Sequence, residues 1–188
     1  MFSPLLVIKQ FGRDETGTVM AETLIVLPLL LWAYMALFVY WDSFRAMNKV
    51  QKATYTISDT ISREMATVPS TYFDGLKSVM NLLIDGDQTV KLRVTSITFD
   101  QDENKYKVLW SYSPNGDFLE YTDTTLNDVR GKIPNMSDAD FATIVETEVP
   151  FTPVFDVGLT FNSFKQFIVT RPRFVAPTCM TGRVCTPA

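Results

Sequence analysis

The chain has 188 residues, a formal net charge of −4 from 17 basic and 21 acidic residues, and no histidine. Because the basic residues form no block, the sequence gives no support for nucleic-acid binding. The missing histidine removes the commonest general base and metal ligand. We therefore expect no catalytic residue, no metal site, no cofactor and no small-molecule substrate, and the length suits one folded domain with an anchor.

The first element along the chain is an uncharged apolar run from Thr23 to Trp41. As a helix it is roughly 28 Å long, which matches the hydrocarbon thickness of a bilayer. Tyr40 and Trp41 fall where an interfacial aromatic belt lies, and Pro28 is expected to bend the helix. A secretory signal peptide is the alternative, but its apolar core is only about 7 to 15 residues long and ends at a small-x-small cleavage site. The run is longer, and we predict a retained single-pass anchor.

A single carboxylate, Glu22, stands at the beginning of this run, five residues after Gly17. Such a charge costs about 2.5 to 3.5 kcal/mol at the centre of a membrane helix and less near its end. Cleavage between Gly17 and Thr18 would create a positive α-amine one helical turn before Glu22. That amine, from the same chain or a neighbour, would neutralise the carboxylate, and the helix dipole favours it. Alternatively, Gly17 is a flexible linker and Glu22 reaches water from the headgroup level.

Two cysteines, Cys179 and Cys185, lie near the C-terminus and form neither a C-x-x-C motif nor a four-ligand metal set. In an exported domain they are expected to form a disulfide that closes a small loop, whereas in a reducing compartment they would remain thiols. Basic residues flank the apolar run on both sides, so their count does not fix the orientation. The large C-terminal part with its cysteine pair favours a cytoplasmic N-terminus and an exported domain.

Apolar residues continue beyond the run at steps of three and four as far as Met65, which predicts that the helix reaches the region of Pro69. A second helix is predicted at 71–84, with Phe73, Leu76, Met80 and Leu83 on one face. Strands are predicted at 90–99, 105–112, 142–151 and 165–174, and 113–137 reads as an irregular excursion with a short helix around Leu126.

These elements predict an α+β fold, in which a long N-terminal transmembrane helix precedes a small antiparallel β-sheet domain, and the resemblance described next implies that this helix is a pilin-like stem. The expected parts are a cytoplasmic leader at 1–17, a helix at 18–68 that includes the transmembrane segment 23–41, and an exported domain at 69–188. Seven aromatic residues of the domain are expected in its core rather than on a partner surface. They are Trp110, Tyr112, Phe151, Phe155, Phe161, Phe164 and Phe167.

The stretch GTVMAE, from Gly17 to Glu22, ahead of a long apolar helix resembles the processing site of type IV prepilins. In those proteins a prepilin peptidase cuts after the glycine, and the glutamate at mature position five guides subunit docking. The wider stretch FGRDETGTVMAETLIVLPLLLW, at 11–32, is similar to the TadE-like family of pseudopilins from the tight-adherence (Tad) pilus machinery. VETEVPFTPVFDVG at 145–158 and VTRPRF at 169–174 are similar to the family's closing strands. The resemblance covers roughly the first 45 and the last 45 residues.

The resemblance implies a minor pilin or pseudopilin of a Tad-type pilus assembly or secretion system. It implies processing between Gly17 and Thr18, docking through Glu22, and a place in the bacterial inner membrane with the C-terminal domain in the periplasm. The implied partners are that membrane, a prepilin peptidase and other pilins or pseudopilins, and whether the protein enters the pilus stays open. The alternative is an uncleaved, membrane-anchored periplasmic binding module of a cell-envelope complex. An exported enzyme finds no support among the residues.

Overall fold

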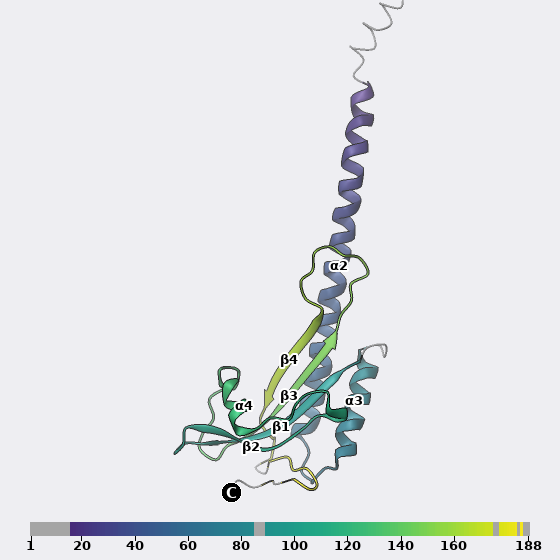
Figure 1. Ribbon diagram of the computed structural model, residues 1–188. Coiled ribbons are helices and arrows are strands. Elements are labelled where there is room, and N and C mark those ends of the chain that lie inside the picture. Colours follow the sequence, from purple (N-terminus) through teal and green to yellow (C-terminus); the bar gives the residue numbers. More distant parts are fainter. Residues whose placement is uncertain (1–15, 85–88, 175–176, 184, 186–188) are drawn as a thin grey trace, which may run out of the picture. The chain divides into compact units, whose positions relative to one another are not determined.

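The computed structural model describes residues 16–84, 89–174, 177–183 and 185. Its elements (Figure 1) are the helices α2 (Thr16–Ser62), α3 (Ser70–Leu83) and α4 (Asp123–Asp128), the short 3-10 turns η1 (Pro114–Gly116) and η2 (Arg130–Lys132), and the strands β1 (Lys91–Asp100), β2 (Lys105–Tyr112), β3 (Phe141–Pro150) and β4 (Ser163–Thr170). The predicted α+β fold, with one long apolar N-terminal helix and an antiparallel sheet, is confirmed.

The chain divides into two compact units, which are described separately. Among the described residues, the first unit consists of α2 up to Asp42 together with the segment Pro153–Gly158, which we name the tip. The second unit contains the rest of α2, α3, α4 and the four strands, and we name it the sheet unit. α2 itself is a helix of 47 residues that continues through Pro28.

The four strands form one antiparallel sheet in the order β2-β1-β3-β4. The pairing of β1 with β2 is regular except at one point, where Ser96 faces Trp110 but Ile97 faces Val108. Leu109 is therefore the extra residue of a β-bulge. As a result, Leu109 and Trp110 both join the core on one face of the sheet, while Val108 packs with the core on the other face.

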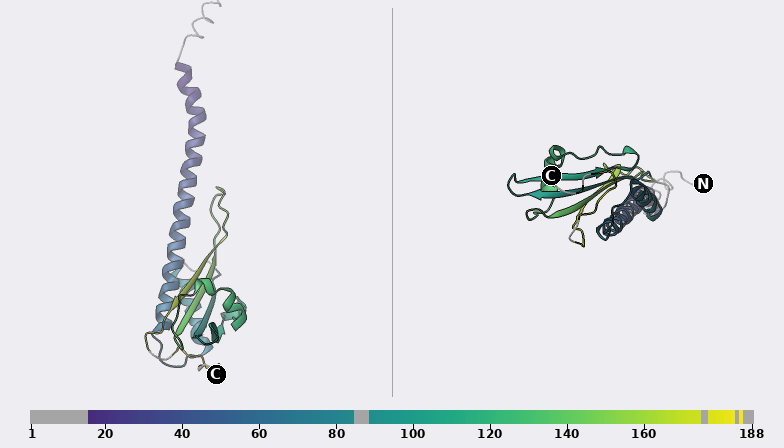
Figure 2. Two further views of the ribbon diagram at one scale, coloured as in Figure 1. Left: turned by 90° about the vertical axis from the view of Figure 1, so that its left-hand side faces the viewer. Right: turned by 90° about the horizontal axis from the view of Figure 1, so that it is seen from below.

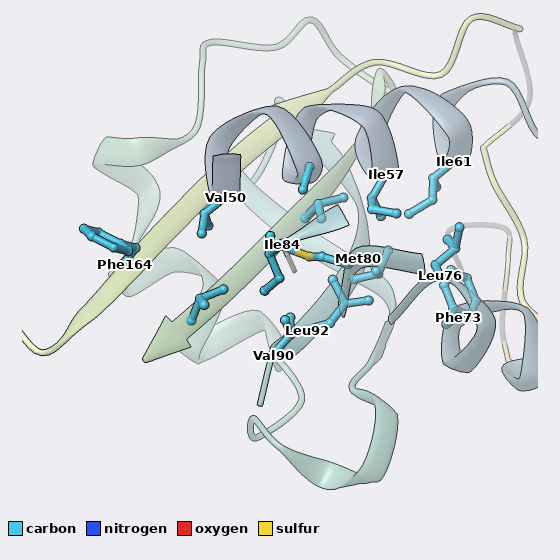
Figure 3. Close-up of a cluster of buried hydrophobic side chains, with 14 of the residues drawn as sticks. Val50, Ile57, Ile61, Phe73, Leu76, Met80, Ile84, Val90, Leu92 and Phe164 are labelled. Atoms are coloured by element: carbon cyan, nitrogen blue, oxygen red, sulfur yellow. The ribbon is translucent and has the colours of Figure 1, made fainter. Parts of the chain in front are cut away.

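The first face of the sheet is covered by the C-terminal part of α2 and by α3. The buried residues of α2 in this core recur at steps of three and four, as a helix packed on one side requires, and are Val50, Ala53, Ile57 and Ile61. From α3, Phe73 and Met80 are fully buried, and Figure 3 shows them among the side chains between the helices and the sheet. The Phe73 ring lies 5.3 Å from the Trp110 ring of β2.

The second face is covered by the excursion between β2 and β3, which Figure 2 shows on the opposite side of the sheet from α3. The predicted short helix around Leu126 is confirmed as α4, and Leu126 is fully buried among apolar side chains of β1 and β3 such as Ile97 and Ile144. Thr122 caps α4 by accepting a hydrogen bond from the Thr125 N–H. The excursion is thus the second half of the core.

α4 also covers the free edge of β2. The Asn127 side chain accepts a hydrogen bond from the Tyr106 N–H at 3.2 Å and donates one to the Tyr106 carbonyl at 2.9 Å. The Asp123 carboxylate accepts a hydrogen bond from the Val108 N–H at 2.7 Å. Because side chains occupy these backbone groups, this edge of the sheet is closed to pairing with another strand.

Three details of the predicted elements are wrong. α2 ends at Ser62 rather than near Pro69, and Met65, expected on its apolar stripe, is 74% exposed. Leu83, expected on the buried face of α3, is 45% exposed. β4 ends at Thr170 rather than at 174.

The early end of α2 has a physical reason in the C-terminal segment of the chain. Val68 forms a parallel bridge with Met180, in which the Val68 N–H donates to the Cys179 carbonyl and the Thr181 N–H donates to the Val68 carbonyl. These bonds require an extended backbone at Val68, which a helix cannot provide. Pairing with a remote segment therefore overrides the local helical periodicity.

Candidate functional site

The N-terminal part of α2 exposes an almost continuous apolar surface. The exposed large hydrophobic residues here are Val19, Met20, Leu24, Ile25, Val26, Leu27, Leu29, Leu30, Leu31, Trp32, Tyr34, Met35, Leu37, Phe38, Tyr40 and Trp41. Within the described part of the chain, α2 is the one helix whose length and composition would allow it to cross a bilayer. Only 6% of its most apolar 18-residue stretch is buried. This surface is not part of a core, and it is compatible with a single-pass membrane anchor.

Glu22 is the only charged residue between Val19 and Trp41. Because α2 begins at Thr16, Glu22 lies in the second turn of the helix, and its side chain is exposed. Glu22, Val26 and Leu30 follow one another at intervals of four residues and therefore lie on the same side of α2. Together with neighbouring apolar residues they line one shallow hollow of about 520 Å³. The carboxylate is thus part of an apolar patch.

Gly17 lies one residue inside the first turn of α2, and it is exposed. A side chain added at this position would meet nothing within 4 Å. The predicted cleavage would therefore break the peptide bond between Gly17 and Thr18 in the first turn of α2. Gly17 precedes Glu22 by five residues. At the other end of the apolar surface, Tyr40 and Trp41 are 44% and 57% exposed.

Cys179 and Cys185 form a disulfide, as predicted, with their Cα atoms 5.3 Å apart. Thr178, the residue before this disulfide loop, is bonded to two other parts of the sheet unit. The Thr178 carbonyl accepts a hydrogen bond from the buried Trp110 indole N–H at 2.9 Å, and the Thr178 hydroxyl donates to the Ile61 carbonyl at 3.3 Å. The C-terminal segment therefore fastens the end of α2 to β2.

Several charged side chains of the sheet unit form ion pairs, some of them between neighbouring strands. On the second face, the Arg93 guanidinium pairs with Glu146 of the neighbouring strand and lies 3.7 Å from the centre of the Tyr121 ring. Burial, with a further contribution from the Glu146 charge, raises the pKa of the Tyr121 hydroxyl to about 12. Among the described residues, no group of three or more acidic, cysteine or histidine side chains is placed to hold a metal ion.

Glu148 lies beside this pair and belongs to a second, more exposed network. Its carboxylate accepts a hydrogen bond from the Ser163 hydroxyl at 3.1 Å and lies 3.5 Å from the Lys91 ammonium and 3.6 Å from that of Lys165. Partial burial alone would raise the pKa of Glu148, but the Ser163 hydrogen bond and the two lysine charges outweigh it and hold the pKa below its usual value. The network thus favours the ionised carboxylate.

A second open hollow, of about 570 Å³, lies where the start of β3 meets the segment after β4. Two arginines line it, but each is held by a carboxylate. Arg171 pairs with Asp140 at 2.6 Å, and Arg173 pairs with Asp59 of α2. The hydrogen bonds from Arg63 and Arg173 lower the pKa of Asp59. Because both guanidinium groups already have acidic partners, the hollow offers little to an anionic ligand.

The prediction that the seven aromatic residues lie in the core is wrong for two of them. Trp110, Phe151 and Phe164 are buried, but Phe155 is 45% exposed and Phe161 is 40% exposed. Phe155 belongs to the tip, where Pro153, Asp156 and Gly158 are turn-forming residues. These residues, and the position of the tip between two predicted strands, are the signal that could have identified it as an exposed loop.

No protein-family model, curated protein or solved structure matches the chain.

Proposed function

We propose that the protein is a minor pilin or pseudopilin-like component of a Tad-type, type IV-related pilus assembly or secretion system. In this proposal a prepilin peptidase cuts after Gly17, and Glu22 guides docking to other subunits. The observation that carries the proposal is the position of Glu22. It is the one charged residue in the exposed apolar part of α2 between Val19 and Trp41, and it follows Gly17 by five residues.

The physical argument concerns what covers α2 and what neutralises Glu22. An apolar helix exposed along such a length can be covered first by a bilayer and later by the helices of neighbouring subunits. The carboxylate opposes burial in either environment unless a cation accompanies it. The α-amine that cleavage would create at Thr18 lies one helical turn away along the chain, and the same amine of a neighbour could replace it on assembly. Glu22 would then fix the register between subunits.

The second candidate is an uncleaved, single-pass anchored binding module of a cell-envelope complex in the periplasm. It is supported by the same apolar helix and by the disulfide, which is typical of domains outside the reducing cytoplasm. In this case Glu22 lies at the headgroup level and has no docking role. The two candidates predict different N-termini, because only the first requires processing.

The first experiment determines the N-terminus of the protein after expression with a prepilin peptidase. We expect the intact mass to correspond to a chain that begins at Thr18. The matched control is Gly17→Val, whose added side chain has open space around it, so the variant should fold and insert but remain uncut. A wild-type chain that retains its leader would favour the anchored module.

The second experiment measures co-purification with partner pilins for Glu22→Ala and Glu22→Gln. Membrane insertion should be unchanged or improved, because each variant removes a charge from the apolar run. Loss of a charge-assisted contact of about 1.5 to 3 kcal/mol should lower recovery of the partners about tenfold or more. Asp42→Asn, at the far end of the same run, should behave as wild type. Equal recovery for all four proteins would refute the docking role.

A further inference from the structure

The tip of the β3–β4 connection is an apolar surface that the proposed function does not use. Val154 is 69% exposed and Phe155 is 45% exposed, although both are large apolar residues at the surface. Between Phe155 and Gly158 the turn is held by the Asp156 carboxylate, which accepts a hydrogen bond from the Gly158 N–H at 3.1 Å. Gly158 has a φ of +83°, a conformation that favours glycine. The tip is therefore a folded turn with its apolar side chains outward.

The position of the tip follows from the unit to which it belongs. The tip groups with α2 up to Asp42, and among the described residues it is the only segment of this unit besides the helix. Nearly all of this part of α2 is exposed, but Val39 is only 2% exposed. A helix cannot bury one of its own side chains to this extent, so another segment covers Val39, and the tip is the described segment that groups with this part of the helix.

This position sets the depth of the tip in a bilayer. Val39 precedes Trp41 by two residues, which is about 3 Å along a helix axis. If the apolar run spans the membrane and Trp41 marks its interface, a segment beside Val39 must lie at the boundary between headgroups and acyl chains. Val154 and Phe155 are suited to this layer, while the exposed Asp156 and the irregular backbone keep the tip from going deeper.

We propose that the tip is a second membrane-binding element, which inserts Val154 and Phe155 into the leaflet at which α2 leaves the bilayer. The inference depends on the membrane anchorage in the proposed function and adds a second point of attachment to it. Two attachments along one chain would restrict tilting of the sheet unit over the lipid surface. The occupant of this apolar surface is lipid, and not a neighbouring protein.

The test uses the full-length protein in vesicles of phosphatidylcholine and phosphatidylglycerol. Single cysteines at Val154→Cys, Leu37→Cys and Thr124→Cys are each labelled with an environment-sensitive fluorophore, since the native cysteines are joined in a disulfide. Leu37 reports on the anchor, and the exposed Thr124 of α4 reports on the sheet unit. Lipids with a spin label near the glycerol backbone should quench the labels at 154 and 37 about twofold or more relative to the label at 124.

Further variants test the chemistry of the insertion. Phe155→Asp in the Val154→Cys protein should abolish the quenching, because a second carboxylate opposes insertion. Leu119→Asp is the matched control, since Leu119 is an 89% exposed apolar residue of the sheet unit, and quenching at 154 should be unchanged.

Each of the other outcomes overturns a defined part of the inference. Quenching at 37 with none at 154 overturns the role of the tip and leaves the anchor intact. An absence of quenching at 37 overturns the membrane anchor and the tip with it. Shielding of 154 from both lipid and aqueous quenchers, seen only at high protein density, would assign the tip to a protein neighbour and overturn the proposal.

Discussion

Truncation of Leu126 to alanine tests whether the excursion between β2 and β3 is half of the core. Leu126 is fully buried between α4 and the second face of the sheet. The substitution removes three buried carbon groups at about 0.8 kcal/mol each, and the cavity left behind adds to this loss. We therefore expect the sheet unit to lose about 3 kcal/mol of unfolding free energy. For a protein of this size, the loss corresponds to a decrease in Tm of about 6 to 12 °C.

Leu119→Ala is the matched control, because it makes the same chemical change in the same excursion at a residue that is 89% exposed. Urea unfolding of the full-length protein in detergent, followed by near-ultraviolet circular dichroism, reports the loss of packed aromatic residues in the sheet unit. The control should lie within about 0.5 kcal/mol of wild type. If Leu126→Ala also lies within this interval, the excursion does not complete the core and the reasoning fails.

Two further predictions concern pH and the disulfide. Because the pKa of Glu148 is held below its unfolded value of 4.5, its contribution to stability is present above that pH and is lost as the pH falls. Urea titrations between about pH 6 and pH 3 should therefore show a steeper loss of stability for wild type than for Glu148→Gln, and parallel curves would contradict this. Replacing Cys179 and Cys185 by serine should cost about 2 kcal/mol on a chain-entropy argument for so short a loop. Hydrogen exchange at the Thr181 amide should then accelerate, and an unchanged rate would show that the bridge to Val68 does not need the disulfide.

The elements of the sheet unit could be predicted to within a few residues because their patterns are local. The predicted bounds of β2 match the observed ones, since Lys105–Tyr112 is rich in aromatic and aliphatic residues and follows a polar turn. The buried stripe of α2 from Val50 to Ile61 follows in the same way from helical spacing. The stripe of α2 faces one core, and its spacing in the sequence records that face, whereas the β-bulge that lets β2 contribute to both cores is not visible in the sequence pattern.

The errors occur where a distant segment decides the conformation. Met65 continues the helical spacing, but the backbone of Val68 pairs with Met180, and local periodicity contains no record of that partner. The tip is a second case, in which a residue expected to be buried is exposed. Aromatic residues are usually buried, yet Phe155 is exposed on a turn between two strands, so its surroundings could not be read from residue type.

The processing site, the docking role of Glu22 and the inner-membrane location stay predictions. The sequence pattern provides the candidate residues, and the geometry provides an exposed apolar stretch of α2, between Val19 and Trp41, that carries one carboxylate. Assembly is a property of several chains, so the partner surfaces cannot be read from one chain alone. The mass of the mature chain tests the processing site, and the Glu22 variants test the docking role.

The bonds between the end of α2 and the C-terminal segment have a consequence for biosynthesis. Ile61 and Ser62 are made before the four strands, whereas Arg173 and Thr178, which bond to their carbonyl oxygens, are made only after them. Met180, another member of the same core, follows only after these. Folding that depends on such remote contacts is slow and leaves apolar surface open to aggregation in the meantime. The bonds that fasten the end of α2 to the C-terminal segment can therefore form only after all four strands and the segment up to Thr178 have been made.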